Sequence, residues 1–136
     1  MANEILKELM LGFPIFFLSA TGILLVISDA LTGKNKVINY IFAIIILSLT
    51  IGSSGWILLN QYYKEASSLA SYPITMGMLA YNGYAYIFDL IFVVAALLTI
   101  IAAREYNERA EFEYKEFYSL VVLATVGMMM IAHSAD

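Results

Sequence analysis

The sequence predicts an all-α, polytopic membrane protein with four transmembrane helices. Of its 136 residues, 62% are hydrophobic and only 13% are charged, which is far from the composition of a soluble domain. A bilayer core about 30 Å thick requires roughly 20 apolar residues for each helical crossing, and the chain has room for four such runs. The runs lack the alternation of barrel strands, so helices must satisfy the backbone in lipid. Residues 1–136 then form a single membrane domain.

Each span is justified by an uninterrupted apolar run and the polar residues that flank it. The first span contains Pro14 near its expected start, where a missing N–H is best tolerated, and Asp29 follows its end. The second is uncharged, and the third holds a single internal acid, Asp89. The fourth follows a charged segment and ends before His133. The predicted bounds are 9–27, 37–59, 84–103 and 117–132.

The three connections differ in character. The first is short and basic, and the second is long, rich in tyrosine and contains ITMGMLAY (74–81), which favours a small surface hairpin. The third begins with Glu105 and Arg109 at an i,i+4 spacing, which favours a solvated helical extension. The first and third connections hold five of the seven basic residues, namely Lys34, Lys36, Arg104, Arg109 and Lys115. The positive-inside rule therefore places both in the cytoplasm, with the N-terminus and Asp136 outside it.

Composition also excludes several classes of function. The net charge of −4 is spread over the connections without a basic patch, so no nucleic-acid partner is expected. The chain has no cysteine and a single histidine, which leaves no thiolate or histidine-spaced metal site. Neither a phosphate-binding loop nor a nucleophile elbow is present. We therefore predict no metal, and no complete catalytic site.

Three ionisable residues are candidates for a proton path. Asp89 lies inside an apolar span, where an acid adds roughly 2.5–3.5 kcal/mol to the free energy of insertion and is a candidate functional residue. The favoured interpretation is nevertheless that it contacts the interface or a neighbouring residue. Asp29 closes the first span and is expected to meet interfacial water or Lys34 and Lys36. His133 could titrate at a proton exit, but a solvated or capping histidine is favoured.

A cluster of small residues lies inside the second span, formed by Gly52, Ser53 and Gly55 together with Ser54. Such clusters allow helix backbones to approach closely. They predict a packing surface against a partner helix. The run Met128-Met129-Met130 points in three directions around a helix and is best interpreted as packing filler.

Several segments carry a family resemblance. Three short motifs follow one another near the end of the chain: EFYSL (116–120), GMM (127–129) and SAD (134–136). They match, in order, an E-[FY]-Y-x-L helix start, a Gly-Met-rich stretch and a Ser-Ala-Asn-Asp-Leu-like turn. In addition, LLVISDALTGKNK (24–36) places an aspartate before a basic turn. In this the chain resembles the N-terminal part of subunit N of bacterial NADH:quinone oxidoreductase, the respiratory complex I. Asn82 and Asp89 depart from that family's pattern, so no site residue of the third span is transferred.

The resemblance implies an antiporter-like, membrane-arm subunit of a proton-translocating complex, here as a truncated piece of a longer chain. It implies a multi-pass protein of the bacterial inner membrane whose partners are other membrane-arm subunits and the lipid bilayer. It also implies a non-redox subunit of a translocase that binds no cofactor itself, while partner subunits use NADH, or another electron donor, and quinone. The family's proton-handling glutamate and lysine lie on helices five and seven, which this sequence does not reach.

Two alternatives remain open from the sequence. An Mrp-type cation/proton antiporter or a membrane-bound hydrogenase subunit would share the fold, and a stand-alone four-helix assembly or interaction protein would share the composition. The order of EFY, GMM and SAD favours subunit N. A Leu-Gly-Leu-Glu-like motif shortly downstream in the reading frame would support that choice, whereas a stop codon without a partner gene would support the stand-alone protein.

Overall fold

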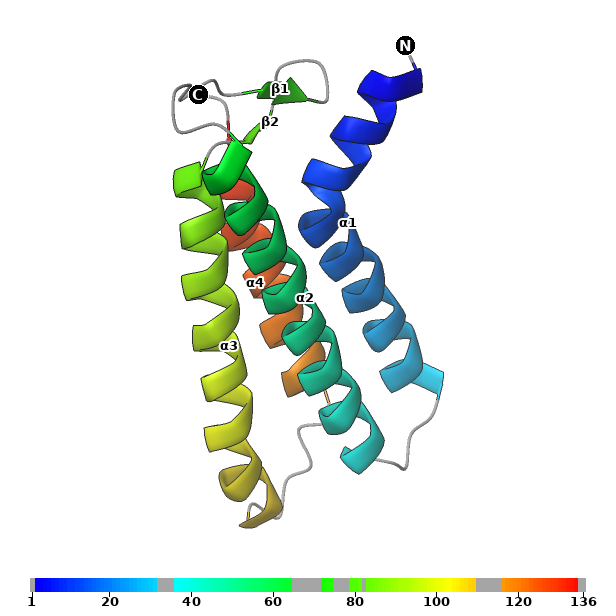
Figure 1. Cartoon of the computed structure of the whole chain (residues 1–136). Coiled ribbons are helices and arrows are strands. Elements are labelled where there is room, and N and C mark those ends of the chain that lie inside the picture. Colours follow the sequence, from blue (N-terminus) through cyan, green and yellow to red (C-terminus); the bar gives the residue numbers. More distant parts are fainter. Residues whose placement is uncertain are drawn as a thin grey trace.

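The computed structural model describes residues 2–31, 36–64, 72–74, 79–81, 83–109 and 116–134. These residues form four helices and a two-stranded hairpin: α1 (Ala2–Leu31), α2 (Lys36–Lys64), β1 (Tyr72–Ile74), β2 (Leu79–Tyr81), α3 (Gly83–Arg109) and α4 (Phe117–Ala132). Figure 1 shows the helices alternating in direction along the chain, with the start of α1, the hairpin and the end of α4 at the same end. The predicted four-helix membrane fold is confirmed.

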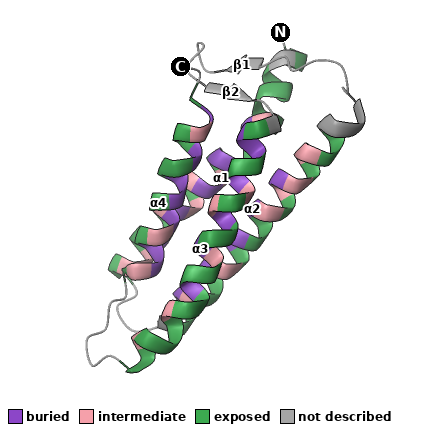
Figure 2. Cartoon of the chain, turned by 90° about the vertical axis from the view of Figure 1, so that its left-hand side faces the viewer, coloured by how far each residue is buried: buried purple, intermediate pink, exposed green. Residues whose placement is uncertain are grey.

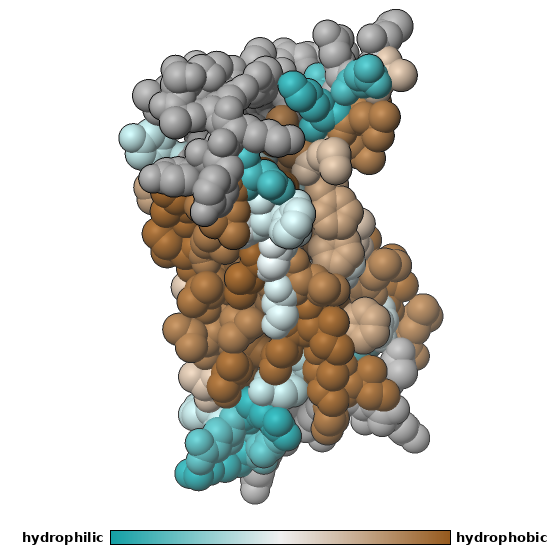
Figure 3. Space-filling view, in the orientation of Figure 1, coloured by the Kyte–Doolittle hydropathy of each residue, from teal (hydrophilic) through white to brown (hydrophobic). Residues whose placement is uncertain are grey.

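Three of the described helices can cross a membrane by their length and composition. Their spans are Ile5–Leu31, Val37–Asn60 and Tyr84–Arg109. Helix α4 is equally apolar but shorter, with 16 residues that extend about 24 Å at about 1.5 Å per residue. In Figure 3 a broad hydrophobic belt separates hydrophilic groups at the two ends of the bundle. The chain is thus a multi-pass membrane protein.

The long helices extend beyond the apolar runs that predicted them. Helix α1 begins at Ala2 rather than at residue 9, because the Ala, Glu, Leu and Lys of the front end are good helix formers. Pro14 therefore lies inside the helix, and its expected place near the helix start is wrong. An interior proline removes one backbone hydrogen bond and crowds the preceding turn. Figure 1 shows α1 changing direction in its N-terminal half, as such a residue predicts.

The hairpin between α2 and α3 is short and antiparallel. Tyr72 lies opposite Tyr81, and Ile74 lies opposite Leu79. The expected hairpin at 74–81 is confirmed, with its first strand beginning two residues earlier. The expected helical extension after the third span is also confirmed, because α3 continues to Arg109 and an ion pair joins Arg109 to Glu105.

The core lies between the four helices, each of which contacts its two neighbours around the bundle. Leu18, Leu47, Val93 and Val122, one from each helix, are completely buried. Figure 2 shows buried residues on the faces that point into the bundle and exposed residues on the outer faces. The outer faces carry large apolar side chains, which suits a surface in contact with lipid. Packing between helices therefore explains the apolar side chains on the inner faces, and contact with the bilayer explains those on the outer faces.

Candidate functional site

A buried carboxyl–imidazole pair joins α3 to α4 near the end of the bundle that carries the hairpin. His133 Nε2 lies 2.7 Å from Asp89 Oδ2, and both side chains have an exposed fraction of 0%. The two residues are 44 positions apart in the sequence. A carboxyl and an imidazole so completely removed from solvent form the strongest candidate site within the described residues.

Local structure places both side chains. Asp89 follows the start of α3 by about two turns and occupies the same helical stripe as the buried Tyr86, Val93 and Ala96. His133 is the C-cap of α4, and its backbone N–H donates to the carbonyl oxygen of Met129 at 3.1 Å. Because α3 and α4 run in opposite directions, the beginning of one meets the end of the other. Topology and helix rotation together create the pair.

Tyr86 links the pair to a third helix. Its ring meets the ring of His133 edge to face, with centroids 5.2 Å apart and an interplanar angle of 76°. Its hydroxyl donates a hydrogen bond of 2.7 Å to the backbone carbonyl of Leu11 on α1. The other carboxylate oxygen of Asp89, Oδ1, is buried and accepts no hydrogen bond from the described residues. The site is therefore built by α1, α3 and α4.

The arrangement is suited to holding a proton between two bases. The proton between Nε2 and Oδ2 can reside on either atom, and the pair as a whole is neutral in both cases. A net charge at such a position would be costly, because burial removes its hydration. A carboxyl in contact with an imidazole is an arrangement suited to acid–base chemistry. Among the described residues no group of three metal-ligating side chains is found.

The structure places the three proton-path candidates at two sites. Asp89 pairs with a neighbouring residue, which was the favoured interpretation, and does not reach the interface. The favoured interpretation of His133 as a solvated or capping residue is confirmed for the cap, because His133 is the C-cap of α4. It is wrong for the solvated state, because the side chain is completely buried. Asp29 is not part of this pair. A role in proton transfer stays a prediction for all three.

Asp29 belongs to a separate polar cluster where α1 ends and α2 begins. The side-chain amide of Asn39 donates to Asp29 Oδ1. The hydroxyl of Ser28 donates to Asn39 Oδ1 at 3.3 Å. The expected contacts of Asp29 with Lys34 and with the side chain of Lys36 lie outside the described residues. Asn39 was missed in the sequence because a single asparagine next to a span carries no distinctive signal.

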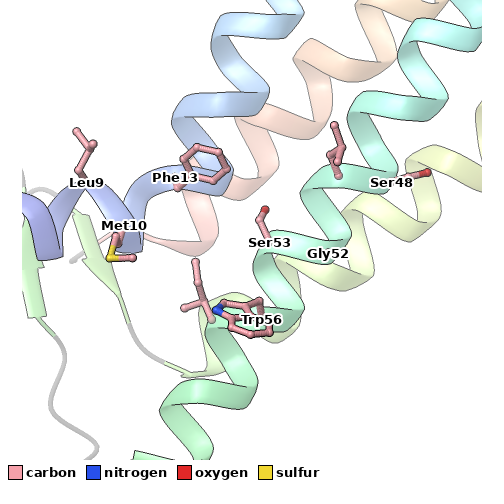
Figure 4. A pocket seen from close by; sticks show the side chains of 9 residues that line it. Leu9, Met10, Phe13, Ser48, Gly52, Ser53 and Trp56 are labelled. Carbon is pink, nitrogen blue, oxygen red and sulfur yellow. The ribbon is translucent and has the colours of Figure 1, made fainter.

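Gly52 and Ser53 of the small-residue cluster on α2 line a groove, whereas Ser54 is completely buried. The groove has a volume of about 470 Å³ and lies between α1 and α2, where Phe13 faces Gly52, Ser53 and Trp56 (Figure 4). A methyl group added at Gly52 or at Gly55 would meet no atom within 4 Å. Their expected packing role therefore has no counterpart among the described residues of this chain and stays a prediction for a partner helix.

The close helix approach occurs instead at Gly22 on α1. A Cβ atom there would lie 3.3 Å from side-chain atoms of both Val122 and Leu123 on α4. Sequence reasoning missed this residue because it is a lone glycine in an apolar run. It also missed Tyr86, whose position one helical turn before Asp89 was the available signal.

Comparison with known proteins supports one family. No family model matches the chain. It is 29% identical over 136 residues to the F(420)H(2) dehydrogenase subunit N of Methanosarcina mazei, with 96% of this chain and 26% of the relative covered. It is 26% identical over 131 residues to the NADH-quinone oxidoreductase subunit N 1 of Koribacter versatilis, with the same coverage. A third relative, subunit N from Moorella thermoacetica, is 32% identical over 87 residues, or 64% of this chain and 17% of that protein.

These relatives agree with the motifs found in the sequence. The first two alignments include nearly the whole bundle, while the chain spans about a quarter of the length of those relatives. The resemblance of this chain to subunit N of NADH-quinone oxidoreductase is therefore confirmed.

Proposed function

We propose that the chain works as part of an antiporter-like, membrane-arm subunit of a proton-translocating NADH:quinone oxidoreductase. The observation that carries the proposal is the similarity to subunit N over 96% of the chain. The fold supports it, because apolar helices with lipid-suited outer faces are what a membrane-arm subunit requires. The name of the relative from Methanosarcina mazei contains F(420)H(2), so the proposal leaves the electron donor open.

The contribution of this chain within such a complex is structural and protonic rather than redox. It holds no electron carrier in our proposal, and NADH or another donor and quinone react in partner subunits. The exposed apolar faces of its helices contact lipid and neighbouring membrane-arm subunits. Asp89, His133 and Asp29 are the residues through which it would take part in proton movement.

The proposed orientation follows from the basic residues and the alternating helices. The last residues of α1 and of α3 lie at the same end of the bundle (Figure 1), and the predicted connections 28–36 and 104–116 hold most of the Lys and Arg residues. We assign that end to the cytoplasm. The Asp89–His133 pair then lies toward the outer side of a bacterial inner membrane.

Membrane vesicles from the host test the proposal directly. Quinone-dependent oxidation of the electron donor should drive proton uptake into inverted vesicles, and deletion of the gene should abolish it. Expression of the unmodified gene should restore it, and an affinity-tagged chain should purify together with quinone-reductase activity. The proposal is wrong if the deletion strain retains full donor-driven proton uptake and the tagged chain carries no quinone-reductase activity.

A further inference from the structure

We propose that Asp89 and His133 form a proton-binding site whose access to water is controlled by the N-terminal arm of α1, which Tyr86 ties to α3. The N-terminal arm is defined as residues 2–13, the part of α1 that precedes Pro14. The inference concerns the bundle itself and holds whether or not the chain works in an oxidoreductase.

The closed Asp89–His133 site retains one proton. Nε2 of His133 and Oδ2 of Asp89 are 2.7 Å apart with no exposure to solvent. One proton shared between them leaves the site neutral. A second proton would bury a positive charge, and loss of the shared proton would bury a negative one, and either state is strongly disfavoured without water. The closed site therefore keeps one proton, and exchange requires that water reach it.

Tyr86 lies against the site and connects it to the N-terminal arm. The ring of Tyr86 lies against the ring of His133, and the hydroxyl of Tyr86 donates to the carbonyl of Leu11 in the N-terminal arm. A single side chain thus contacts the histidine and holds the arm. Loss of that hydrogen bond would release the arm without removing any atom of the pair.

The N-terminal arm is able to move relative to the rest of the bundle. Pro14 leaves the carbonyl of Met10 without its usual N–H donor and crowds the turn that contains Leu11. Met10 is 70% exposed and Leu9 is 62% exposed, whereas Ile15 and Leu18, just beyond the proline, are buried. The groove of about 470 Å³ separates the arm from α2. A segment with few buried contacts opens at a lower free energy than the core does.

Other ionisable groups at this end do not provide the pair with a competing partner among the described side chains. Lys7 and Glu8 on α1 and Tyr84 on α3 are exposed. The described side chains in the same half of α2 include no acid or base. On α4 the other titratable residue, Tyr118, lies near the opposite end of that helix. Among the described side chains, His133 is in contact with both Asp89 and Tyr86.

The test uses the fact that His133 is the only histidine of the chain. The full chain, labelled with ¹⁵N-histidine and placed in lipid nanodiscs, gives ring signals that report the protonation of this residue alone. Tyr86→Phe removes only the hydroxyl that holds the arm. Tyr84→Phe is the matched control, since it removes an exposed hydroxyl from the same helix two residues earlier.

In the unmodified chain the proton shared by Nε2 of His133 and Oδ2 of Asp89 should exchange with solvent slowly, because both side chains are fully buried. Tyr86→Phe should accelerate solvent exchange of the ring proton about 2- to 10-fold, the range that corresponds to a typical hydrogen bond. Tyr84→Phe should leave the exchange rate unchanged. Equal exchange rates in Tyr86→Phe and Tyr84→Phe would overturn the proposal.

A second measurement needs no variant. Diethyl pyrocarbonate should modify His133 much more slowly in the folded chain than in the chain unfolded by SDS. Equal rates would show that the site is open to water and would also overturn the proposal. Neither measurement depends on quinone reduction, so failure here is distinguishable from failure of the proposed function.

Discussion

Removal of the Asp89–His133 interaction should reveal how strongly α3 is coupled to α4. The perturbation is a double-mutant cycle of Asp89→Leu, His133→Leu and the double variant, which isolates the pairwise energy. Interhelical hydrogen bonds in bilayers average about 0.6 and reach about 1.7 kcal/mol, and charge-assisted bonds are roughly twice as strong as neutral ones. The 2.7 Å distance and complete burial place this pair in the stronger group. We therefore expect a coupling energy of about 1.5–3 kcal/mol.

The two single variants should differ in a way that the structure specifies. His133→Leu leaves a buried carboxyl with neither oxygen hydrogen-bonded by the described residues, because Oδ1 of Asp89 already lacks such a partner. Asp89→Leu removes the carboxylate that contacts Nε2 of His133 and leaves no buried carboxyl. A stranded carboxyl is the costlier of the two. The His133→Leu chain should accordingly be the less stable, and the double variant should recover part of the loss.

The assay is reversible unfolding of the purified chain by SDS in mixed micelles, followed by circular dichroism. A cycle on Glu105 and Arg109 provides the control, because that i,i+4 pair is exposed on both sides and should show little coupling. A coupling energy for Asp89 and His133 no larger than the control value would refute the reasoning. So would a His133→Leu chain that is more stable than Asp89→Leu.

Three further results are expected. Gly22→Ala should lower the free energy of unfolding by about 1–2 kcal/mol, because its new methyl group meets α4 side chains at 3.3 Å. The control Gly127→Ala should not, because its methyl group meets no atom within 4 Å. Equal SDS midpoints for the two variants would contradict this prediction. Gly52→Leu should leave the SDS midpoint unchanged but reduce co-purification with partner subunits, and undiminished co-purification would exclude a packing role. Asn39→Ala should cost about 1–3 kcal/mol, since Asp29 loses its donor; an unchanged midpoint would show that this cluster contributes nothing.

The number and order of the helices could be predicted because three apolar runs are long enough to cross the bilayer and the fourth is an uninterrupted, though shorter, apolar run. The start of α1 at Ala2 and the end of α3 at Arg109 could not be predicted in the same way. Hydropathy detects the part of a helix that is in lipid, while polar helix formers continue the helix into water. Because polar helix formers extend α1 back to Ala2, Pro14 lies inside the helix rather than near its start.

The candidate site could be predicted only in part. An acid inside an apolar span is conspicuous, so Asp89 was identified from the sequence. Its partner depends on how α3 and α4 are rotated about their axes, and hydropathy does not determine that rotation at the level of one residue. Gly22 and Gly52 show the same limit, because which glycine meets another helix is decided by packing rather than by composition.

The separation of Asp89 and His133 by 44 residues has a consequence for biosynthesis. Helix α3 emerges from the ribosome before α4 does, so Asp89 approaches the bilayer before its histidine. An unpaired acid at the centre of a span adds about 2.5–3.5 kcal/mol to the free energy of insertion, and Asp89, about two turns from the start of α3, adds a smaller cost. Of the three long described helices, α3 has the most apolar window, which offsets that cost. The arrival of α4 then completes the site, which makes the pairing of Asp89 with His133 a late step that retains the two helices together in the membrane.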